Sequence, residues 1–170
     1  VLHLIERETD HALAGRPGRI IAKMNALNEP QVVRALYAAS QAGVQIDLIV
    51  RGACTLRPGV PGVSDNIRVR SIIGRFLEHS RVYWFGNDQA PELFCASADW
   101  LERNLLRRVE TCFPLRDPVL AKRVYNEVLL NYLHDNVNAW ELQADGSYLA
   151  LSPGPGQLPH SAQMLLLEGI

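Results

Sequence analysis

Two short apolar runs flank a stretch with helical periodicity near the start of the chain. Residues 19–24 and 46–50 are mostly apolar, and each is typical of a buried strand. Between them, Asn28 followed by Pro30 predicts the capped first turn of a helix, and Gly43 predicts its end. The apolar face of this helix consists of Val32, Val33, Leu36, Tyr37 and Ala39. This strand–helix–strand order favours a parallel crossover between the two strands.

The rest of the chain alternates between further apolar runs and turns. Residues 51–66 are rich in glycine and proline and form a loop after the second strand. Two more helices are predicted, over residues 2–14 and from Asp117, as the cap, to about residue 135. We predict further strands at residues 67–73, 81–85, 93–97 and 109–113, and a small hairpin at residues 139–143 and 148–151.

These elements predict one α/β domain with a mixed, mostly parallel sheet flanked by helices. A length of 170 residues is ordinary for one domain. We place a helical lead-in at residues 1–18. The α/β domain follows at residues 19–152, with a C-terminal tail at residues 153–170. The chain begins without Met, as a piece cut from a longer protein would.

Composition narrows the class of protein. Apolar residues make up 48% of the chain and charged residues 21%, which excludes a disordered protein. No apolar run approaches the ~20 residues that span a bilayer, and the charged first residues do not fit a signal peptide. The net charge of -1 argues against general nucleic-acid binding. We therefore expect a cytoplasmic protein with no transmembrane segment and no nucleic-acid partner.

The three cysteines are spaced too widely for a zinc site or a disulfide framework. Cys54, Cys95 and Cys112 each have apolar or small neighbours. We predict that all three are buried free thiols in a reducing compartment.

The basic residues are almost all arginine. The chain has 15 Arg and 2 Lys, and nine of the arginines fall in residues 51–108 together with six acidic residues and no lysine. An arginine fork grips phosphate with two hydrogen bonds, whereas lysine acts as a point charge. Genomic base composition is the alternative explanation for the arginine excess.

Three segments carry candidate chemistry. Arg51 and Gly52 follow a buried strand, where open α/β sheets bind ligands. His79 and Arg81 are two residues apart, so in an extended segment both could meet one phosphate. Residues 97–104 collect short polar side chains, an arginine and a tryptophan after a further strand. The alternatives are an exposed loop arginine, a structural surface histidine and a capped turn.

Several longer motifs, taken together, resemble the C-terminal part of the bacterial polyphosphate kinases of the histidine-phosphorylating type. The resemblance extends from about residue 4 to the tail. The matching runs are Leu36-Tyr37-Ala38-Ala39-Ser40, Val50-Arg51-Gly52-Ala53-Cys54, Gly62-Val63-Ser64-Asp65-Asn66-Ile67-Arg68, Arg75-Phe76-Leu77-Glu78-His79-Ser80-Arg81-Val82-Tyr83, Ser97-Ala98-Asp99-Trp100-Leu101-Glu102-Arg103-Asn104 and Pro114-Leu115-Arg116-Asp117-Pro118.

The resemblance implies the second of two phospholipase D-like halves and a reversible reaction. That family transfers the terminal phosphoryl group of ATP to inorganic polyphosphate through a phosphohistidine in the preceding domain, and no residue here matches that histidine. The resemblance implies that Arg51 and His79 contact ATP or ADP, with His79 as proton donor or phosphate partner. The further candidate phosphate-binding residues are Arg68, Arg75, Arg81, Ser97 and Asn104.

The same resemblance sets the expected cofactor and partners. Mg²⁺ would accompany ATP, with its ligands outside this chain. The preceding domains of the same protein would be partners, the full-length enzyme would be a homo-oligomer, and membrane association of that enzyme is an alternative to a purely cytoplasmic location. We expect the fragment alone to bind weakly and not to turn over.

Two alternatives stay open. The first is a phospholipase D-like phosphodiesterase, whose His-x-Lys-x-x-x-x-Asp pattern is only partly present: Arg81 stands at the Lys position after His79, and Gly86 at the Asp position. The second is a non-catalytic module that supports assembly of a larger protein. Catalysis of phosphoryl transfer consists largely of positioning the phosphates and stabilising their charge. A site with many arginines and few acidic residues is suited to that task.

Overall fold

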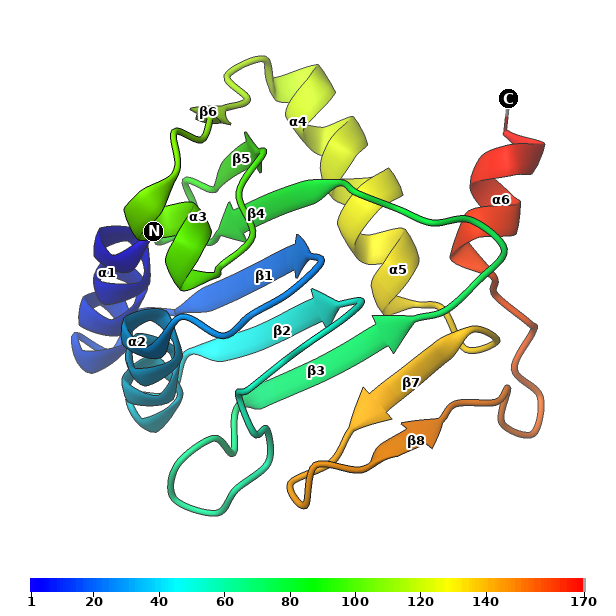
Figure 1. The fold of residues 1–170 in the computed structure, drawn as a ribbon, viewed down its shortest axis with the longest axis horizontal. Helices are drawn as coiled ribbons and strands as arrows, with labels where there is room; N and C mark the ends of the chain where they lie inside the picture. The colour runs from blue at the N-terminus through cyan, green and yellow to red at the C-terminus, as the bar shows by residue number, and fades with distance from the viewer. Residues whose placement is uncertain (170) are drawn as a thin grey trace.

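The apolar runs form a single sheet in the computed structural model, which describes residues 1–169. Within these residues the sheet has eight strands in the order β6-β5-β4-β1-β2-β3-β7-β8 (Figure 1). The strands are β1 (Arg19–Met24), β2 (Gln45–Val50), β3 (Ile67–Ile72), β4 (Arg81–Phe85), β5 (Glu92–Ala96), β6 (Cys112–Pro114), β7 (Ala139–Leu142) and β8 (Tyr148–Ala150). The chain therefore has the predicted α/β class, with the sheet at its centre.

The prediction of a mostly parallel sheet was wrong. Only β1 with β2 and β2 with β3 pair in parallel, and the other strand pairs within residues 1–169 are antiparallel. The parallel crossover predicted between β1 and β2 is confirmed. The later connections are hairpins or returns across the strand ends, and these reverse the chain direction.

One of these returns decides where the candidate residues lie. Residues 73–80 leave β3, cross the ends of β2 and β1, and enter β4, which pairs antiparallel with β1 (Figure 1). The crossing covers three strand spacings, about 14 Å, which eight extended residues reach easily. We call residues 73–80 the crossing segment; it lies along the edge where β1, β2 and β3 end.

Helices cover both faces of the sheet (Figure 1). Helix α1 (Leu2–Leu13) packs against α2 (Pro30–Gln41) on one face, and α4 (Pro118–Val124), η1 (Tyr125–Leu130) and α5 (Asn131–Leu133) form one continuous helical rod on the other. Successive strand residues point to opposite faces, so Ile20 belongs to the first core cluster and Ile21 to the second. Ile5 of α1 also belongs to the first cluster.

Several local predictions need correction. The α2 cap is Glu29, not Asn28: the Glu29 carboxylate accepts the Val32 N–H at 2.7 Å. Asp117 caps α4 as predicted, but the long helix that follows contains the π-helical turn η1. Helices α3 (Glu102–Arg107) and α6 (Ala162–Glu168) were not predicted, because each is too short to show a clear period.

Helices lie in both segments that flank the predicted α/β domain. Helix α1 lies in the predicted lead-in, and α6 lies in the predicted tail, whose last residue, Ile170, is outside the described residues. The proposed domain boundaries stay a prediction. No helix within residues 1–169 is long and apolar enough to cross a membrane.

The three thiols are free, as predicted, but they are not fully buried. Cys54 and Cys95 are half-buried, and Cys112 is exposed because β6 is the edge strand of the sheet. Burial raises the pKa of the Cys54 thiol to about 11.

Candidate functional site

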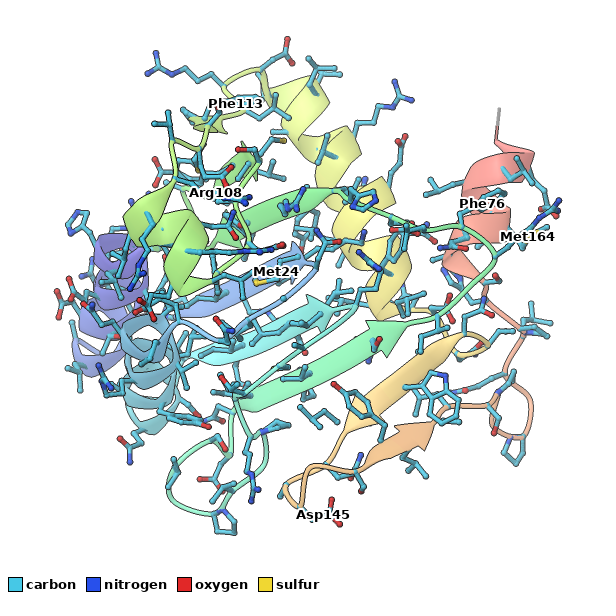
Figure 2. All side chains as sticks on the ribbon, in the orientation of Figure 1. Met24, Phe76, Arg108, Phe113, Asp145 and Met164 are labelled. Carbon is cyan, nitrogen blue, oxygen red and sulfur yellow. The ribbon has the colours of Figure 1, made fainter. Side chains whose placement is uncertain are left out.

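The polar candidates gather where the parallel strands end. Met24, Val50 and Ile72 are the last residues of β1, β2 and β3, and β4 starts at the same edge with Arg81. Figure 2 shows Met24 at the end of β1 and Phe76 on the crossing segment. Open α/β sheets bind ligands at this edge, so Arg51 and His79 lie where sequence reasoning placed a site.

Arg51 is held by a neutral group. Its Nε and Nη2 atoms donate to Oδ1 of Asn25, at 3.2 and 2.9 Å, and its carbonyl accepts the Ser71 hydroxyl at 3.2 Å. Within residues 1–169 no carboxylate forms an ion pair with Arg51, and its Nη1 atom makes no hydrogen bond. The guanidinium is therefore positioned without forming an ion pair within the described residues.

Asp99 joins two parts of this edge. Its Oδ1 atom accepts the backbone N–H of Asn25 at 2.7 Å. The same carboxylate pairs with Arg81 through two bonds, Nε to Oδ1 at 3.1 Å and Nη2 to Oδ2 at 3.2 Å. These shared hydrogen bonds connect Arg81, Asp99, Asn25 and Arg51 into one polar chain. The Asp99 carboxylate at its centre is buried. The first residue of β4 and the residue after β2 are thereby fixed relative to each other.

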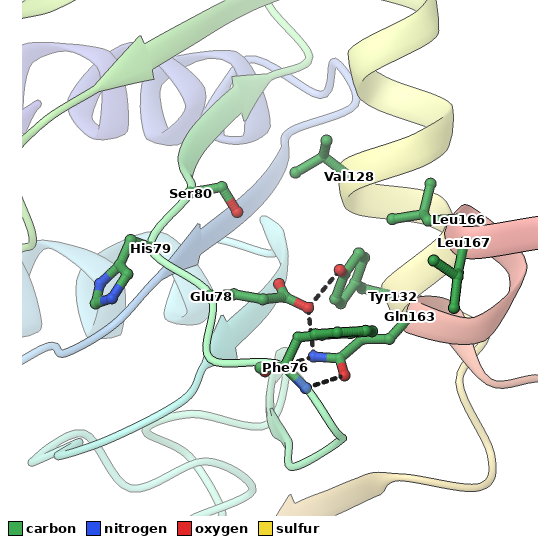
Figure 3. Close-up of a pocket in the computed structure, with 9 residues that line it drawn as sticks. All are labelled: Phe76, Glu78, His79, Ser80, Val128, Tyr132, Gln163, Leu166 and Leu167. Atoms are coloured by element: carbon green, nitrogen blue, oxygen red, sulfur yellow. Dashed lines mark hydrogen bonds between the residues drawn. The ribbon is translucent and has the colours of Figure 1, made fainter. Parts of the chain in front are cut away.

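His79 is exposed at the end of the crossing segment. Its carbonyl accepts a hydrogen bond from Nη1 of Arg81 at 2.9 Å, which fixes the backbone here. Figure 3 shows the imidazole on the opposite side of the segment from the Glu78 carboxylate. The ring is therefore available to a ligand outside the protein core.

A buried network on the other side of the segment was missed by sequence reasoning. Lys23 of β1 donates to Glu78 Oε2 at 2.5 Å and to the Ser80 hydroxyl at 2.7 Å, and its ammonium lies 4.5 Å from the centre of the Tyr132 ring. Glu78 also accepts bonds from Tyr132, at 2.5 Å, and Gln163, at 2.6 Å (Figure 3). A lysine among the apolar residues of β1 was the available signal, because a buried ammonium needs a partner.

Burial and pairing act in opposite directions in this network. Burial lowers the pKa of Lys23, and the hydrogen bond and negative charge of Glu78 offset that only in part. Burial alone would raise the pKa of Glu78, but hydrogen bonds from Lys23 and Tyr132 outweigh it and hold the pKa below its usual value. Glu78 is therefore ionised at neutral pH and braces the crossing segment against β1.

The remaining arginines suggested by the sequence lie in other contacts. Arg68, near the start of β3, pairs with Asp47 at 2.8 Å, away from the edge where Arg51 lies. Arg75 is exposed on the crossing segment, with its guanidinium 5.5 Å from the centre of the Phe76 ring. Their part in phosphate binding stays a prediction.

Ser97 and Asn104 meet at a third group, Glu110. Both side chains donate to the carboxylate of Glu110, which holds the pKa of Glu110 below its usual range. Neither side chain contacts Arg51 or His79 within the described chain. The structure thus brings Arg51, Asn25, Asp99 and Arg81 into one network and leaves Ser97 and Asn104 in another.

Comparison with known proteins decides the family. The family model for polyphosphate kinase C-terminal domain 2 matches residues 1–163. The chain belongs to this family. This confirms the resemblance drawn from the motifs around Arg51 and His79.

Relatives of the polyphosphate kinase domain agree with this assignment. The domain is 73% identical over its 170 residues to a polyphosphate kinase of Xylella fastidiosa (strain 9a5c) and 60% identical over 168 residues to one of Pseudomonas aeruginosa. Each alignment covers 24% of the relative, so the chain spans about a quarter of the length of these proteins.

Solved structures place the domain in the same fold. Polyphosphate kinase from Porphyromonas gingivalis superposes with a TM-score of 0.92 at 39% identity, covering 98% of this chain and 26% of that one. NucT from Helicobacter pylori superposes with a TM-score of 0.50 at 12% identity over 76% of this chain and 89% of that one. The second likeness concerns the fold alone.

In the polyphosphate kinase domain, residues 1–169 contain no group of three or more His, Cys, Asp or Glu side chains placed to hold a metal ion. The groups that this sheet edge presents to a ligand are the guanidinium of Arg51, which forms no ion pair within residues 1–169, and the exposed imidazole of His79.

Proposed function

We propose that this domain forms one wall of the nucleotide site of a polyphosphate kinase. In this proposal the full-length enzyme transfers the terminal phosphoryl group of ATP to a histidine of the preceding domain and then to inorganic polyphosphate, releasing ADP, and the reaction is reversible. The chain spans about a quarter of its relatives, so turnover needs the rest of the protein. Membership of the family and the chemistry of the sheet edge both support this proposal.

The single observation that carries the proposal is the state of Arg51. Arg68 and Arg81 each face a carboxylate, Asp47 and Asp99, whereas Arg51 is oriented by an amide oxygen that adds no negative charge. A guanidinium fixed in this way can donate two hydrogen bonds to an anion, and it loses little conformational freedom when the anion binds. Triphosphate oxygens of ATP fit that requirement.

His79 has the complementary role in the proposal. The imidazole is the side chain best suited to give or take a proton near neutral pH, and here it is exposed at the same sheet edge. We assign it to the phosphate groups of ATP, as a proton donor or a hydrogen-bond partner. Arg75 is a further candidate for the polyphosphate chain, because it is exposed on the crossing segment.

The metal, the location and the assembly state complete the proposal. Mg²⁺ would enter as part of the ATP substrate, with its ligands supplied outside this chain. We further propose a cytoplasmic enzyme that acts as a homo-oligomer together with its preceding domains.

The test uses full-length polyphosphate kinase. Arg51→Ala should lower kcat/KM for ATP by roughly 100-fold, the usual cost of removing one charge-stabilising donor, and Arg51→Lys should recover only part of it. His79→Gln should lower kcat. Arg34→Ala removes an exposed arginine of α2 and serves as the matched control, with activity unchanged.

Two results would contradict the proposal. Wild-type kinetics in both Arg51→Ala and His79→Gln would show that this edge does not meet the nucleotide. Cleavage of a model phosphodiester by the purified enzyme, lost in His79→Gln, would favour the phosphodiesterase alternative instead.

A further inference from the structure

The crossing segment is tied to the C-terminal helix by one side chain. Gln163 of α6 accepts the N–H of Phe76 on its Oε1 atom and donates to the Phe76 carbonyl from its Nε2 atom, both at 2.9 Å. This is the two-bond pattern by which neighbouring strands pair, supplied here by an amide side chain. Nε2 also donates to Glu78 Oε1 at 2.6 Å (Figure 3). Gln163 is buried, so water does not compete for these bonds.

The position of Gln163 is set by hydrogen bonds that fix the start of α6, at Ser161 and Ala162. The buried carboxylate of Asp135 accepts the N–H of Ala162 at 2.8 Å, and Asn131 donates to the carbonyl of the same residue at 3.0 Å. Asn138 donates to the Ser161 hydroxyl at 2.8 Å. The residue before Gln163 is thus bonded through its carbonyl to the helical rod, at Asn131, and through its N–H to Asp135, two residues beyond the end of the rod.

Apolar packing does little to hold the crossing segment at this point. A cavity of about 380 Å³ separates the segment from η1 and α6. Its apolar lining consists of Phe76, Val128, Leu166 and Leu167 (Figure 3). The hydrogen bonds of Gln163 span this gap, so they define how far the segment stands from the rod.

We propose that Gln163 is a positioning residue for His79. By fixing Phe76 and Glu78 it sets the backbone of the crossing segment, and Glu78 directly precedes His79. The imidazole then meets the nucleotide phosphate in one orientation, without Gln163 touching the substrate. The inference rests on the proposed role of His79 at the ATP phosphates.

A substitution at Gly74 can disturb the Gln163–Phe76 hydrogen bonds without changing Gln163 itself. A Cβ atom at this position would lie 2.7 Å from Cδ of Gln163, closer than the two atoms tolerate. The amide is the far end of a flexible side chain, so Gly74→Ala would push it aside and break its bonds to Phe76 while leaving α6 intact. Gly74→Ala therefore removes the hydrogen bonds between Gln163 and Phe76 without removing a side chain from α6, whereas Gln163→Ala removes both.

The experiment is a double-mutant cycle in full-length polyphosphate kinase. Gln163→Ala and Gly74→Ala are each made in the wild type and in His79→Gln, with kcat, KM for ATP, the Kd for ADP and the thermal midpoint measured for every variant. Gln157→Ala, an exposed glutamine of the same C-terminal segment, is the matched control. Binding of ADP stays measurable even where turnover is very low.

A positioning role predicts a specific pattern. Gln163→Ala and Gly74→Ala should each lower kcat roughly 10- to 100-fold in the wild type, because a small misplacement of a reacting group is costly. In His79→Gln the same changes should cause less than about a twofold further loss in kcat or in ADP affinity, since residues that act through one another are not additive. Gln157→Ala should match the wild type.

Other patterns overturn the inference in distinguishable ways. If His79→Gln is impaired but Gln163→Ala and Gly74→Ala are not, the positioning role fails and the proposed function stands. If the losses multiply fully in His79→Gln, Gln163 acts on the fold and not through His79. If His79→Gln itself behaves as wild type, the proposed role of His79 fails and this inference fails with it. Should Gln163→Ala lower the thermal midpoint strongly, Gly74→Ala decides.

Discussion

Arg81 and Asp99 face each other through two parallel hydrogen bonds, 3.1 Å from Nε to Oδ1 and 3.2 Å from Nη2 to Oδ2. The relationship matters beyond the pair, because Asp99 also accepts the N–H of Asn25, and the Asn25 side chain orients Arg51. A residue eighteen positions after Arg81 thereby connects the start of β4 to the proposed anion site at the end of β2.

Removing the Asp99 carboxylate should destabilise the chain and disturb Arg51. Asp99→Ala leaves Arg81 without its partner in a largely buried place, which costs about 3 kcal/mol in the free energy of unfolding. Urea denaturation of the chain measures this. Asp88→Ala breaks the exposed pair with Arg16 and should cost less than about 1 kcal/mol. Equal losses in the two variants would contradict the linking role of Asp99.

Asn25 is neutral, and it should affect the affinity for the nucleotide by orienting Arg51. Asn25→Ala keeps Arg51 but removes the oxygen that orients it, so the Kd for ATP should rise by roughly 5- to 10-fold, less than in Arg51→Ala. Equilibrium titration of the full-length enzyme tests this ordering. A Kd as weak as that of Arg51→Ala would mean that Asn25 itself binds the ligand.

Lys23 and Glu78 should depend on each other. Lys23→Met leaves the half-buried Glu78 carboxylate without its cationic partner, at a cost of about 2 kcal/mol in the free energy of unfolding. The double variant Lys23→Met with Glu78→Gln removes both charges and should recover most of that loss. Denaturation of the two variants side by side gives the coupling, and additive losses would show that the pair is not energetically linked.

Asp47 should make the fold sensitive to acid. Burial alone would raise the pKa of Asp47, but hydrogen bonds and charge from Arg68 and Arg19 outweigh it and hold the pKa below its usual 3.8. The stabilisation is present above the unfolded pKa and is lost as pH falls through the folded one. Denaturation midpoints between about pH 6 and pH 2 should therefore fall more steeply in the wild type than in Asp47→Asn. The exposed Asp10→Asn variant controls for the loss of one negative charge.

Much of the chain could be predicted from local pattern. The runs at β1, β2 and β4 are short, apolar and bounded by turn residues, and they form strands where expected. Asp117 caps α4 because a carboxylate before Pro118 satisfies the first free N–H groups of the helix. Short helices such as α3 and α6 carry too few turns to show a period, so the same reasoning missed them.

Whether neighbouring strands run parallel or antiparallel could not be predicted from the local pattern of residues. Apolar runs look alike whether their neighbours run parallel or antiparallel, and only the path of the crossing segment over β2 and β1 reverses β4. The Lys23–Glu78 pair has the same origin, since its members are 55 residues apart and meet only because β4 returns beside β1.

By itself, the sequence determined the α/β class, most element positions, the family and the two residues, Arg51 and His79, proposed to meet the nucleotide. The class and the element positions follow from local spacing, whereas the family and the two proposed residues follow from the resemblance that the longer motifs carry. The tertiary structure alone decided which arginines form ion pairs with a carboxylate, because ion pairing depends on contacts between distant segments. It paired Arg68 with Asp47 and Arg81 with Asp99, and left Arg51 facing only an amide.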